Sequence, residues 1–232
     1  MQAIKFAKSK GAKILSLTNV VGSSITRISD SVVYLNAGPE ISVAATKTFS
    51  SQLAVICKLA LGGASEVPEI IGRAIENGEK MKAVAEKLKG KEHIFFGRAL
   101  SYPIAMEGAL KLKELSYIHA EAYPGGELKH GPLSLIQEGV PVIALAPSDE
   151  SLPKIHGNIK EVKARGAFVI ALTDSPEISR EVDISIQIEK TSPEFYLFAM
   201  LPCLQLLAYY ASVSRGIDPD RPRNLAKSVT VE

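Results

Sequence analysis

The chain has 232 residues, enough for one large or two small domains with a hydrophobic core. Charged residues make up 22% of the chain and hydrophobic residues 46%, and the formal net charge of +2 comes without a basic block, so nothing in the composition points to a nucleic-acid partner. The longest apolar runs, residues 53–61 and 195–211, are short or interrupted by proline and polar residues, which argues against a membrane span.

Short strands alternate with helices in the first third of the chain. The predicted elements are a helix at residues 2–10, a strand at 13–18, a helical turn at 25–29, a strand at 31–35, and helices at 40–61 and 66–89. Glycines mark the helix ends, because Gly11, Gly62 and Gly90 each follow the last residue of a helical pattern.

The same alternation continues to the C-terminus. The predicted elements are a strand at 93–96, a central helix that Pro124 and the two following glycines end, a strand at 141–146, a helix at 152–165, strands at 168–173 and 183–188, a helix at 193–213, and an irregular tail from Arg215. Strands that alternate with helices predict an α/β fold with a parallel sheet covered on both faces.

The chain also repeats itself. Residues 8–19 match residues 163–174 at an offset of 155 positions, and Asp30 matches Asp183 at an offset of 153. This steady offset predicts a duplicated α/β unit. Because the second copy begins near residue 92, we expect the first copy to lack roughly its first 60 to 70 residues, which corresponds to two βα units of a doubly wound sheet.

Residues 107–132 carry the groups best suited to acid–base chemistry. Glu107, Lys111 and Glu114 stand at i, i+4 and i+7, so all three point to the same side of the central helix. His130 follows on a glycine-rich loop. A carboxylate beside a lysine, with a histidine nearby, suits proton transfer near neutral pH. The alternative is an exposed helical face with ordinary salt-bridging charges.

Three separated stretches resemble one family. Residues 107–132 contain Glu-Gly-Ala-Leu-Lys-Leu-Lys-Glu, Tyr-Ile-His-Ala-Glu-Ala and Gly-Glu-Leu-Lys-His-Gly-Pro, residues 36–47 read Asn-Ala-Gly-Pro-Glu-Ile-Ser-Val-Ala-Ala-Thr-Lys, and residues 221–232 read Arg-Pro-Arg-Asn-Leu-Ala-Lys-Ser-Val-Thr-Val-Glu. They closely resemble the isomerase half of the glutamine:fructose-6-phosphate aminotransferase (isomerizing) family, also called glucosamine-6-phosphate synthase, which is built from sugar isomerase (SIS) domains. The resemblance covers essentially the whole chain.

This resemblance implies two SIS-type doubly wound parallel-sheet units, the first incomplete, and an irregular C-terminal tail. It places the C-terminal part of the first unit at residues 1–65, a connecting helix at 66–91, a complete second unit at 92–214 and an active-site tail at 215–232. The family's phosphate-binding loop and its glutamine-hydrolysing domain are not among these residues. We therefore expect little activity from these 232 residues alone.

The resemblance also implies roles for individual residues. Glu114 resembles the acid–base group that moves a proton between C1 and C2 of the sugar, and Lys111 its partner at the sugar hydroxyls, with Glu107 a weaker candidate for holding that lysine. His130 resembles the residue that opens the sugar ring and that serves the neighbouring subunit's site, which implies a homodimer. Lys227 resembles the lysine that forms a Schiff base with the open-chain ketose.

The remaining candidates for substrate binding come from the same resemblance. Val43 and Ala226 correspond to positions that contact the sugar through the backbone, and Ala45 stands where relatives often have serine. Arg98 lies at the carboxyl end of a predicted strand, which is a common ligand position in α/β sheets.

No metal or organic cofactor is expected. His93, His119 and His156 lack the spacing and the companions of a metal site. Cys57 and Cys203 lie in apolar helical contexts, so we expect buried free thiols and a cytoplasmic protein.

The function implied by the resemblance is ketose/aldose isomerisation of a sugar phosphate, within the conversion of fructose 6-phosphate and glutamine-derived ammonia to glucosamine 6-phosphate. Two alternatives stay open: a non-catalytic sugar-phosphate-binding SIS module, and one piece of a split synthase that a separate chain completes. The joint presence of Glu114, His130 and Lys227 favours an enzyme, because binding alone needs no Schiff-base lysine.

Overall fold

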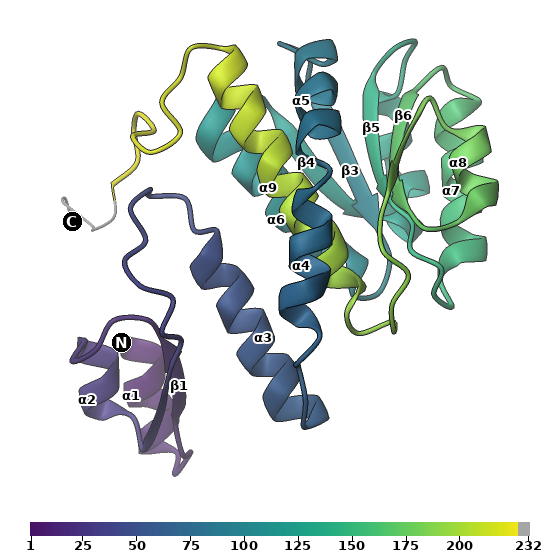
Figure 1. The fold of residues 1–232 in the computed structure, drawn as a ribbon. Coiled ribbons are helices and arrows are strands. Elements are labelled where there is room, and N and C mark those ends of the chain that lie inside the picture. Colours follow the sequence, from purple (N-terminus) through teal and green to yellow (C-terminus); the bar gives the residue numbers. More distant parts are fainter. Residues whose placement is uncertain (227–232) are drawn as a thin grey trace. The chain divides into compact units, whose positions relative to one another are not determined.

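The computed structural model describes residues 1–226, so the predicted Schiff-base residue Lys227 lies outside the described residues. The chain divides into two compact units, residues 1–65 and 66–232, both drawn in Figure 1. In each unit the strands pair in parallel and alternate with helices. The predicted α/β fold with parallel sheets is therefore confirmed. Both cysteines are buried, as predicted.

Residues 1–65 fold around a two-stranded parallel sheet. Their elements are α1 (Gln2–Ser9), β1 (Leu15–Thr18), α2 (Ser24–Ile28), β2 (Ser31–Tyr34) and α3 (Lys47–Leu61). The helix predicted from Glu40 is wrong in its first part. The Glu40 carboxylate accepts hydrogen bonds from the Thr48 backbone N–H (3.0 Å) and from the Thr46 hydroxyl (3.2 Å). These bonds supply an acceptor at the start of α3 and hold the preceding segment as a loop.

Residues 66–232 contain a five-stranded sheet with the strand order β4-β3-β5-β6-β7, in which all pairs are parallel. The elements are α4 (Val67–Ile75), α5 (Gly78–Lys87), β3 (His93–Gly97), α6 (Ser101–Ser116), β4 (Ala120–Pro124), η1 (Gly125–His130), η2 (Pro132–Leu135), β5 (Pro141–Leu145), α7 (Leu152–Lys163), β6 (Phe168–Thr173), α8 (Pro176–Glu181), β7 (Ile184–Gln187) and α9 (Tyr196–Ser214).

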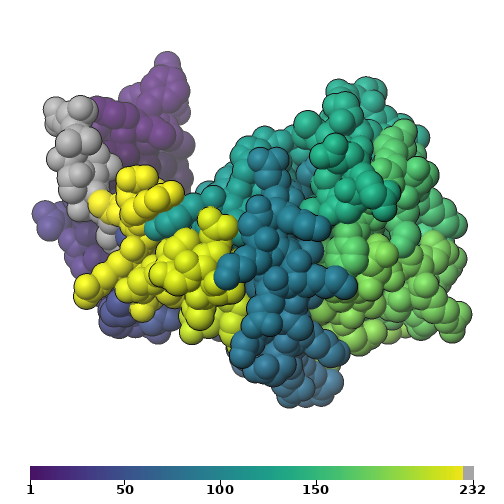
Figure 2. Space-filling view, turned by 90° about the horizontal axis from the view of Figure 1, so that it is seen from above, coloured from purple at the N-terminus to yellow at the C-terminus, as the bar shows by residue number. Residues whose placement is uncertain are grey.

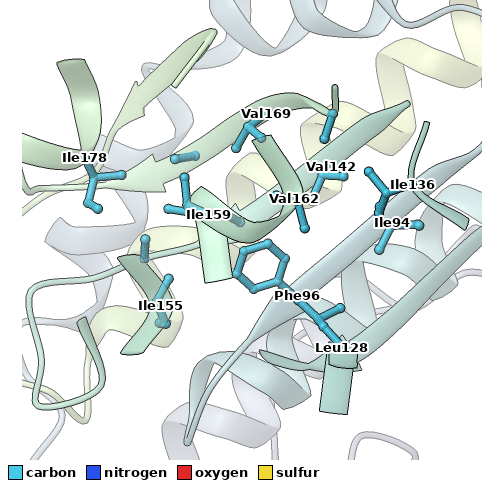
Figure 3. Close-up of a cluster of buried hydrophobic side chains, with 14 residues drawn as sticks. Ile94, Phe96, Leu128, Ile136, Val142, Ile155, Ile159, Val162, Val169 and Ile178 are labelled. Carbon is cyan, nitrogen blue, oxygen red and sulfur yellow. The ribbon is translucent and has the colours of Figure 1, made fainter. Parts of the chain in front are cut away.

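Alternation along β3 divides the core of this unit between the two faces of the sheet. Ile94 and Phe96 point to one face, where they join a cluster with residues of α7, α8 and η1 (Figure 3). Phe95 points to the other face, toward α6, where an added Cβ on Gly108 would lie 3.2 Å from its ring and 2.6 Å from Leu204 of α9. Gly108 thus lets α6 and α9 approach closely.

Helix α9 is long and apolar enough to cross a membrane, but 67% of its apolar window is buried inside the protein. Helices α4, α5 and α6 pack around it, as Figure 1 shows. Its interior Pro202 is itself buried. We therefore describe α9 as the core helix of residues 66–232, in agreement with the prediction that this apolar run is not a span.

Two predicted helices differ from the structure. The helix expected at 66–89 is broken into α4 and α5, where the Asn77 side chain donates a hydrogen bond to the Gln187 carbonyl (3.1 Å) instead of facing solvent. The central helix ends at Ser116, because Tyr117 takes a left-handed conformation (φ 57°). The next residues form the edge strand β4 on β3, which the sequence analysis had placed in the helix. Helix α8 was not predicted either.

The predicted repeat is confirmed by matching contacts. The Asp30 carboxylate accepts a hydrogen bond from the Ile14 backbone N–H (2.7 Å) and pairs with Lys8 (3.1 Å). The Asp183 carboxylate accepts one from the Val169 backbone N–H (2.8 Å) and pairs with Lys163 (3.2 Å). The strand registers match as well, since β1 pairs with β2 in the register in which β6 pairs with β7.

Candidate active site

Glu107, Lys111 and Glu114 meet on one face of α6, as their spacing predicted. The Lys111 ammonium lies between the two carboxylates, 2.5 Å from Glu114 Oε2 and 3.3 Å from Glu107 Oε1. We call these three residues the acid–lysine cluster. Because α6 places residues three and four apart beside one another, the helix alone is enough to assemble it.

The three side chains of the acid–lysine cluster are more buried than charged side chains on a protein surface. The side chains are 4% exposed for Lys111, 10% for Glu107 and 22% for Glu114. An exposed helical face with ordinary salt bridges is therefore excluded. Charged side chains at this depth require pairing, because removing one partner leaves an uncompensated buried charge.

The two carboxylates of the cluster differ in environment. Burial raises the pKa of Glu107, although the Lys111 charge opposes this shift. Glu107 Oε1 is inaccessible to solvent, and its contact with Lys111 lacks the alignment of a hydrogen bond. Glu114 is the more accessible carboxylate and has the shorter contact with Lys111. This arrangement suits a reachable proton acceptor at Glu114, a fixed ammonium at Lys111, and a positioning role for Glu107.

Two of the other predicted site residues, His130 and Ala226, lie in the same compact unit as the cluster but make no hydrogen bond or ion pair with it within residues 1–226. His130 ends η1, is exposed, and makes no hydrogen bond or ion pair with residues 1–226. Val43 and Ala45 lie in the loop before α3, in the other compact unit. Ala226 is exposed at the end of the described tail.

A contact between the tail and the helix of the acid–lysine cluster was missed by the sequence analysis. The Tyr117 hydroxyl accepts a hydrogen bond from the Arg223 backbone N–H (2.6 Å), and the Arg223 guanidinium lies 4.3 Å from the Tyr117 ring. The C-terminal segment, yellow in Figure 2, is otherwise largely exposed. Tyr117 follows Glu114 by three positions, so the tail is attached next to the cluster. No short-range pattern signals a pair 106 residues apart.

The expectation that His156 lacks the companions of a metal site is wrong. Its ring nitrogens lie 2.7 Å from Glu181 and 3.5 Å from Glu177, which α8 brings beside α7. Both nitrogens already face a carboxylate, and Lys160 lies 4.0 Å from Glu181, so the contacts are those of an ion-pair cluster between the two helices. His93 is buried, and burial lowers its pKa to about 4.

Comparisons with known proteins agree with this fold. The SIS domain family model matches residues 1–61 and 87–215. The chain is 49% identical to glutamine–fructose-6-phosphate aminotransferase (isomerizing) of Thermococcus kodakarensis, in an alignment that takes in 100% of this chain but 42% of that relative. It therefore spans less than half the length of this relative.

Solved structures show the same relationship. The C-terminal domain of glucosamine-fructose-6-phosphate aminotransferase from Francisella tularensis has a TM-score of 0.85 at 36% identity, covering 95% of this chain and 68% of that one. Glucosamine-6-phosphate deaminase from Thermotoga maritima has a TM-score of 0.78 at 27% identity, with 98% and 70% covered. Since the family model matches most of its length, the chain belongs to the SIS domain family.

Proposed function

We propose that this chain carries the ketose/aldose isomerisation step of a glutamine:fructose-6-phosphate aminotransferase, acting on fructose 6-phosphate. The observation that supports this most is the buried acid–lysine cluster on α6, with Glu114 as its accessible carboxylate. The relative from Thermococcus kodakarensis is named for this reaction. A module that only binds sugar phosphates has no need for a lysine buried between two carboxylates, which is costly to maintain.

In this proposal Glu114 removes the proton from C1 of the open-chain ketose and returns it to C2. One carboxylate suffices, because the proton leaves and returns on the same face of the enediol. The Lys111 ammonium stabilises the negative charge that develops on the sugar oxygens, and Glu107 holds this ammonium in place. For amination, the Lys227 amine condenses with the C2 carbonyl and loses water to form an imine.

The domain organisation belongs to the same proposal. We assign residues 1–65 to one SIS unit, 66–91 to a connecting segment, 92–214 to a second SIS unit and 215–232 to an active-site tail. The matching aspartate contacts and strand registers of the two copies support this division. The buried position of both cysteines supports a cytoplasmic location.

Trapping the imine tests the role of the tail. The chain is mixed with fructose 6-phosphate, reduced with borohydride and digested, and the adduct is located by mass spectrometry. We expect a reduced sugar adduct on Lys227 and its loss in Lys227→Arg, because arginine keeps the charge but not the nucleophilic amine. Lys113→Arg, at an exposed lysine of α6, is the matched control. An adduct on Lys111 or Lys113 would contradict the assignment.

We further propose a homodimer in which His130 serves the neighbouring subunit's site. Support comes from its exposure and from the lack of any hydrogen bond or ion pair between its side chain and residues 1–226 of its own chain. Mixing the His130→Gln and Glu114→Gln variants of a full-length protein that contains this chain provides the test. If the two residues belong to one shared site, mixed dimers contain one intact site, and the mixture is expected to regain up to about a quarter of the wild-type activity. A mixture as inactive as its components would refute the shared site.

A further inference from the structure

Segment η1, the short 3-10 helix that ends at His130, begins directly after the edge strand β4. Hydrogen bonds in a 3-10 helix are poorer than in an α-helix, so a run of this length keeps its shape only where other elements hold it. His130 does not hold it, because its side chain makes no hydrogen bond or ion pair with residues 1–226. Gly131 follows with a φ of 139°, a value that favours glycine, and η1 stops there. The position of His130 is therefore set by the residues before it.

Leu128 restrains the middle of η1. Its side chain is fully buried in the cluster of Figure 3, together with Phe96 of β3 and with Ile155 and Ile159 of α7. Because protein interiors are close-packed, a side chain enclosed in this way allows little displacement of its own backbone. Leu128 therefore fixes η1 two positions before His130.

A chain of polar contacts holds the next residue. The Lys129 ammonium lies 2.8 Å from Oε1 of Glu161 on α7. The other oxygen of this carboxylate accepts a hydrogen bond from Nδ2 of Asn158 (3.1 Å), and Asn158 Oδ1 accepts one from Nε of Arg98 (3.1 Å). We call Lys129, Glu161, Asn158 and Arg98 the η1 clamp. It joins η1 to α7 and to the connection after β3.

Asn158 is the central member of the η1 clamp. The residue is buried and both ends of its amide are used, so only one orientation of the amide satisfies both partners. Gly125, the first residue of η1, packs so closely that an added Cβ would lie 2.6 Å from Asn158 Oδ1 and 3.2 Å from Arg98 Nε. The beginning of η1 is thus fitted to the same amide that holds its end through Glu161.

The ion pair of the η1 clamp gains from this buried amide. Lys129 is 64% exposed, and an exposed pair by itself contributes little to stability. The Glu161 carboxylate is only 27% exposed, and Asn158 already orders it, so the pair has one long side chain fewer to immobilise. The contact with Lys129 lowers the pKa of Glu161, with a smaller contribution from Asn158, so the carboxylate keeps its charge at neutral pH.

We propose that the η1 clamp positions His130 for the site of the neighbouring subunit, with Asn158 and Glu161 as positioning residues, and this inference rests on the shared site of the proposed function. The two residues that precede His130 are both held on its own subunit, one by packing and one by the η1 clamp. Such precision matters, because a displacement of about 1 Å can lower a catalytic rate about 10²-fold. A clamp that positions His130 affects only the site that receives this histidine.

Mixed dimers test the proposal in a full-length protein that contains this chain. Asn158→Asp keeps the shape of the side chain and its bond from Arg98, but its charge repels Glu161 and opens the η1 clamp. We expect kcat to fall at least tenfold with little change in KM. Mixed with Glu114→Gln, this variant is expected to regain up to about a quarter of the wild-type activity, because mixed dimers contain one intact site. Mixed with His130→Gln, it is expected to regain none.

Lys129 offers a second variant that leaves the core untouched if Asn158→Asp does not fold, because its side chain is exposed. Lys129→Met is expected to lower kcat about threefold and to show the same pattern of complementation, whereas Lys129→Arg keeps the ion pair and most of the rate. The matched control is Lys160→Met, at an exposed lysine next to Glu161 on α7, which is expected to keep the wild-type rate.

The outcomes separate this inference from the proposed function. If His130→Gln and Glu114→Gln do not complement each other, the shared site is refuted and the proposed role of the η1 clamp falls with it. If they do, the proposal is overturned when Asn158→Asp and Lys129→Met complement His130→Gln or fail to complement Glu114→Gln, because the η1 clamp then only stabilises the fold. Wild-type rates in both clamp variants would also overturn it.

Discussion

In a full-length protein that contains this chain, replacing Glu114 by glutamine is expected to lower fructose 6-phosphate isomerisation by about 10³-fold, with little change in KM. Glutamine has nearly the same shape and still accepts a hydrogen bond from Lys111, but it cannot take up the C1 proton. The Lys111 ammonium keeps its contact with Glu107, so the fold is retained. The measurement is the formation of glucose 6-phosphate in D₂O, together with deuterium incorporation at C2.

The control for this experiment is Glu86→Gln, at an exposed carboxylate of α5, which is expected to keep wild-type rates. Lys111→Met provides the complementary variant, because it leaves Glu107 and Glu114 without their shared cation and is expected to lower both activity and stability. If Glu114→Gln isomerises the substrate at the wild-type rate, Glu114 is not the acid–base group. If the wild type forms product without deuterium at C2, the proton instead moves from C1 to C2 without exchanging with solvent on a carboxylate.

The second large effect concerns stability at acidic pH and the buried His93. Its folded pKa is lowered to about 4 by burial, against an ordinary value of 6.5. Between these values the unfolded chain binds the proton and the folded chain does not, so falling pH favours unfolding. Over two pH units inside this window, the free energy of unfolding falls by about 2 to 3 kcal/mol. His93→Gln is expected to remove this loss.

Urea unfolding from pH 7 to pH 4.5 measures the effect as the difference between wild type and His93→Gln. Carboxyl groups whose pKa the fold lowers contribute mainly below the lower end of this pH range. The pKa of Asp30, for example, is lowered by the Ile14 backbone N–H, so its stabilisation is lost only below its ordinary value of 3.8. Glu107 acts in the opposite sense, because burial raises its pKa and falling pH then stabilises the fold. His119→Gln, at a largely exposed ring, is the control. Parallel pH profiles for wild type and His93→Gln would refute a neutral buried His93.

The sequence predicted well those features that residues close to one another in the chain determine. The spacing of Glu107, Lys111 and Glu114 placed them on one helical face, and the repeat placed Asp30 and Asp183 at equivalent turns. Periodicity says nothing of partners distant in the chain. Strand β4 was assigned to the preceding helix because its pairing with β3 is a tertiary contact.

The same reason accounts for the missed features of the candidate sites. His156 gains its carboxylates only when α8 packs beside α7, and Tyr117 meets Arg223 across 106 positions. Arg98 was singled out by its place after a strand, but the hydrogen bond that its Nε donates to Asn158 was not foreseeable.

The paired contacts of Asp30 and Asp183 bear on how sheets of this kind change during evolution. Each aspartate stands just before the second strand of a parallel pair and accepts a hydrogen bond from the backbone at the start of the first strand. The two strands of the pair have the same register in the two-stranded and in the five-stranded sheet. The alignment of each pair is thus set within a short strand–helix–strand segment. Because the same contacts recur at two places in one chain, this segment behaves as a repeated building block that gene duplication can copy.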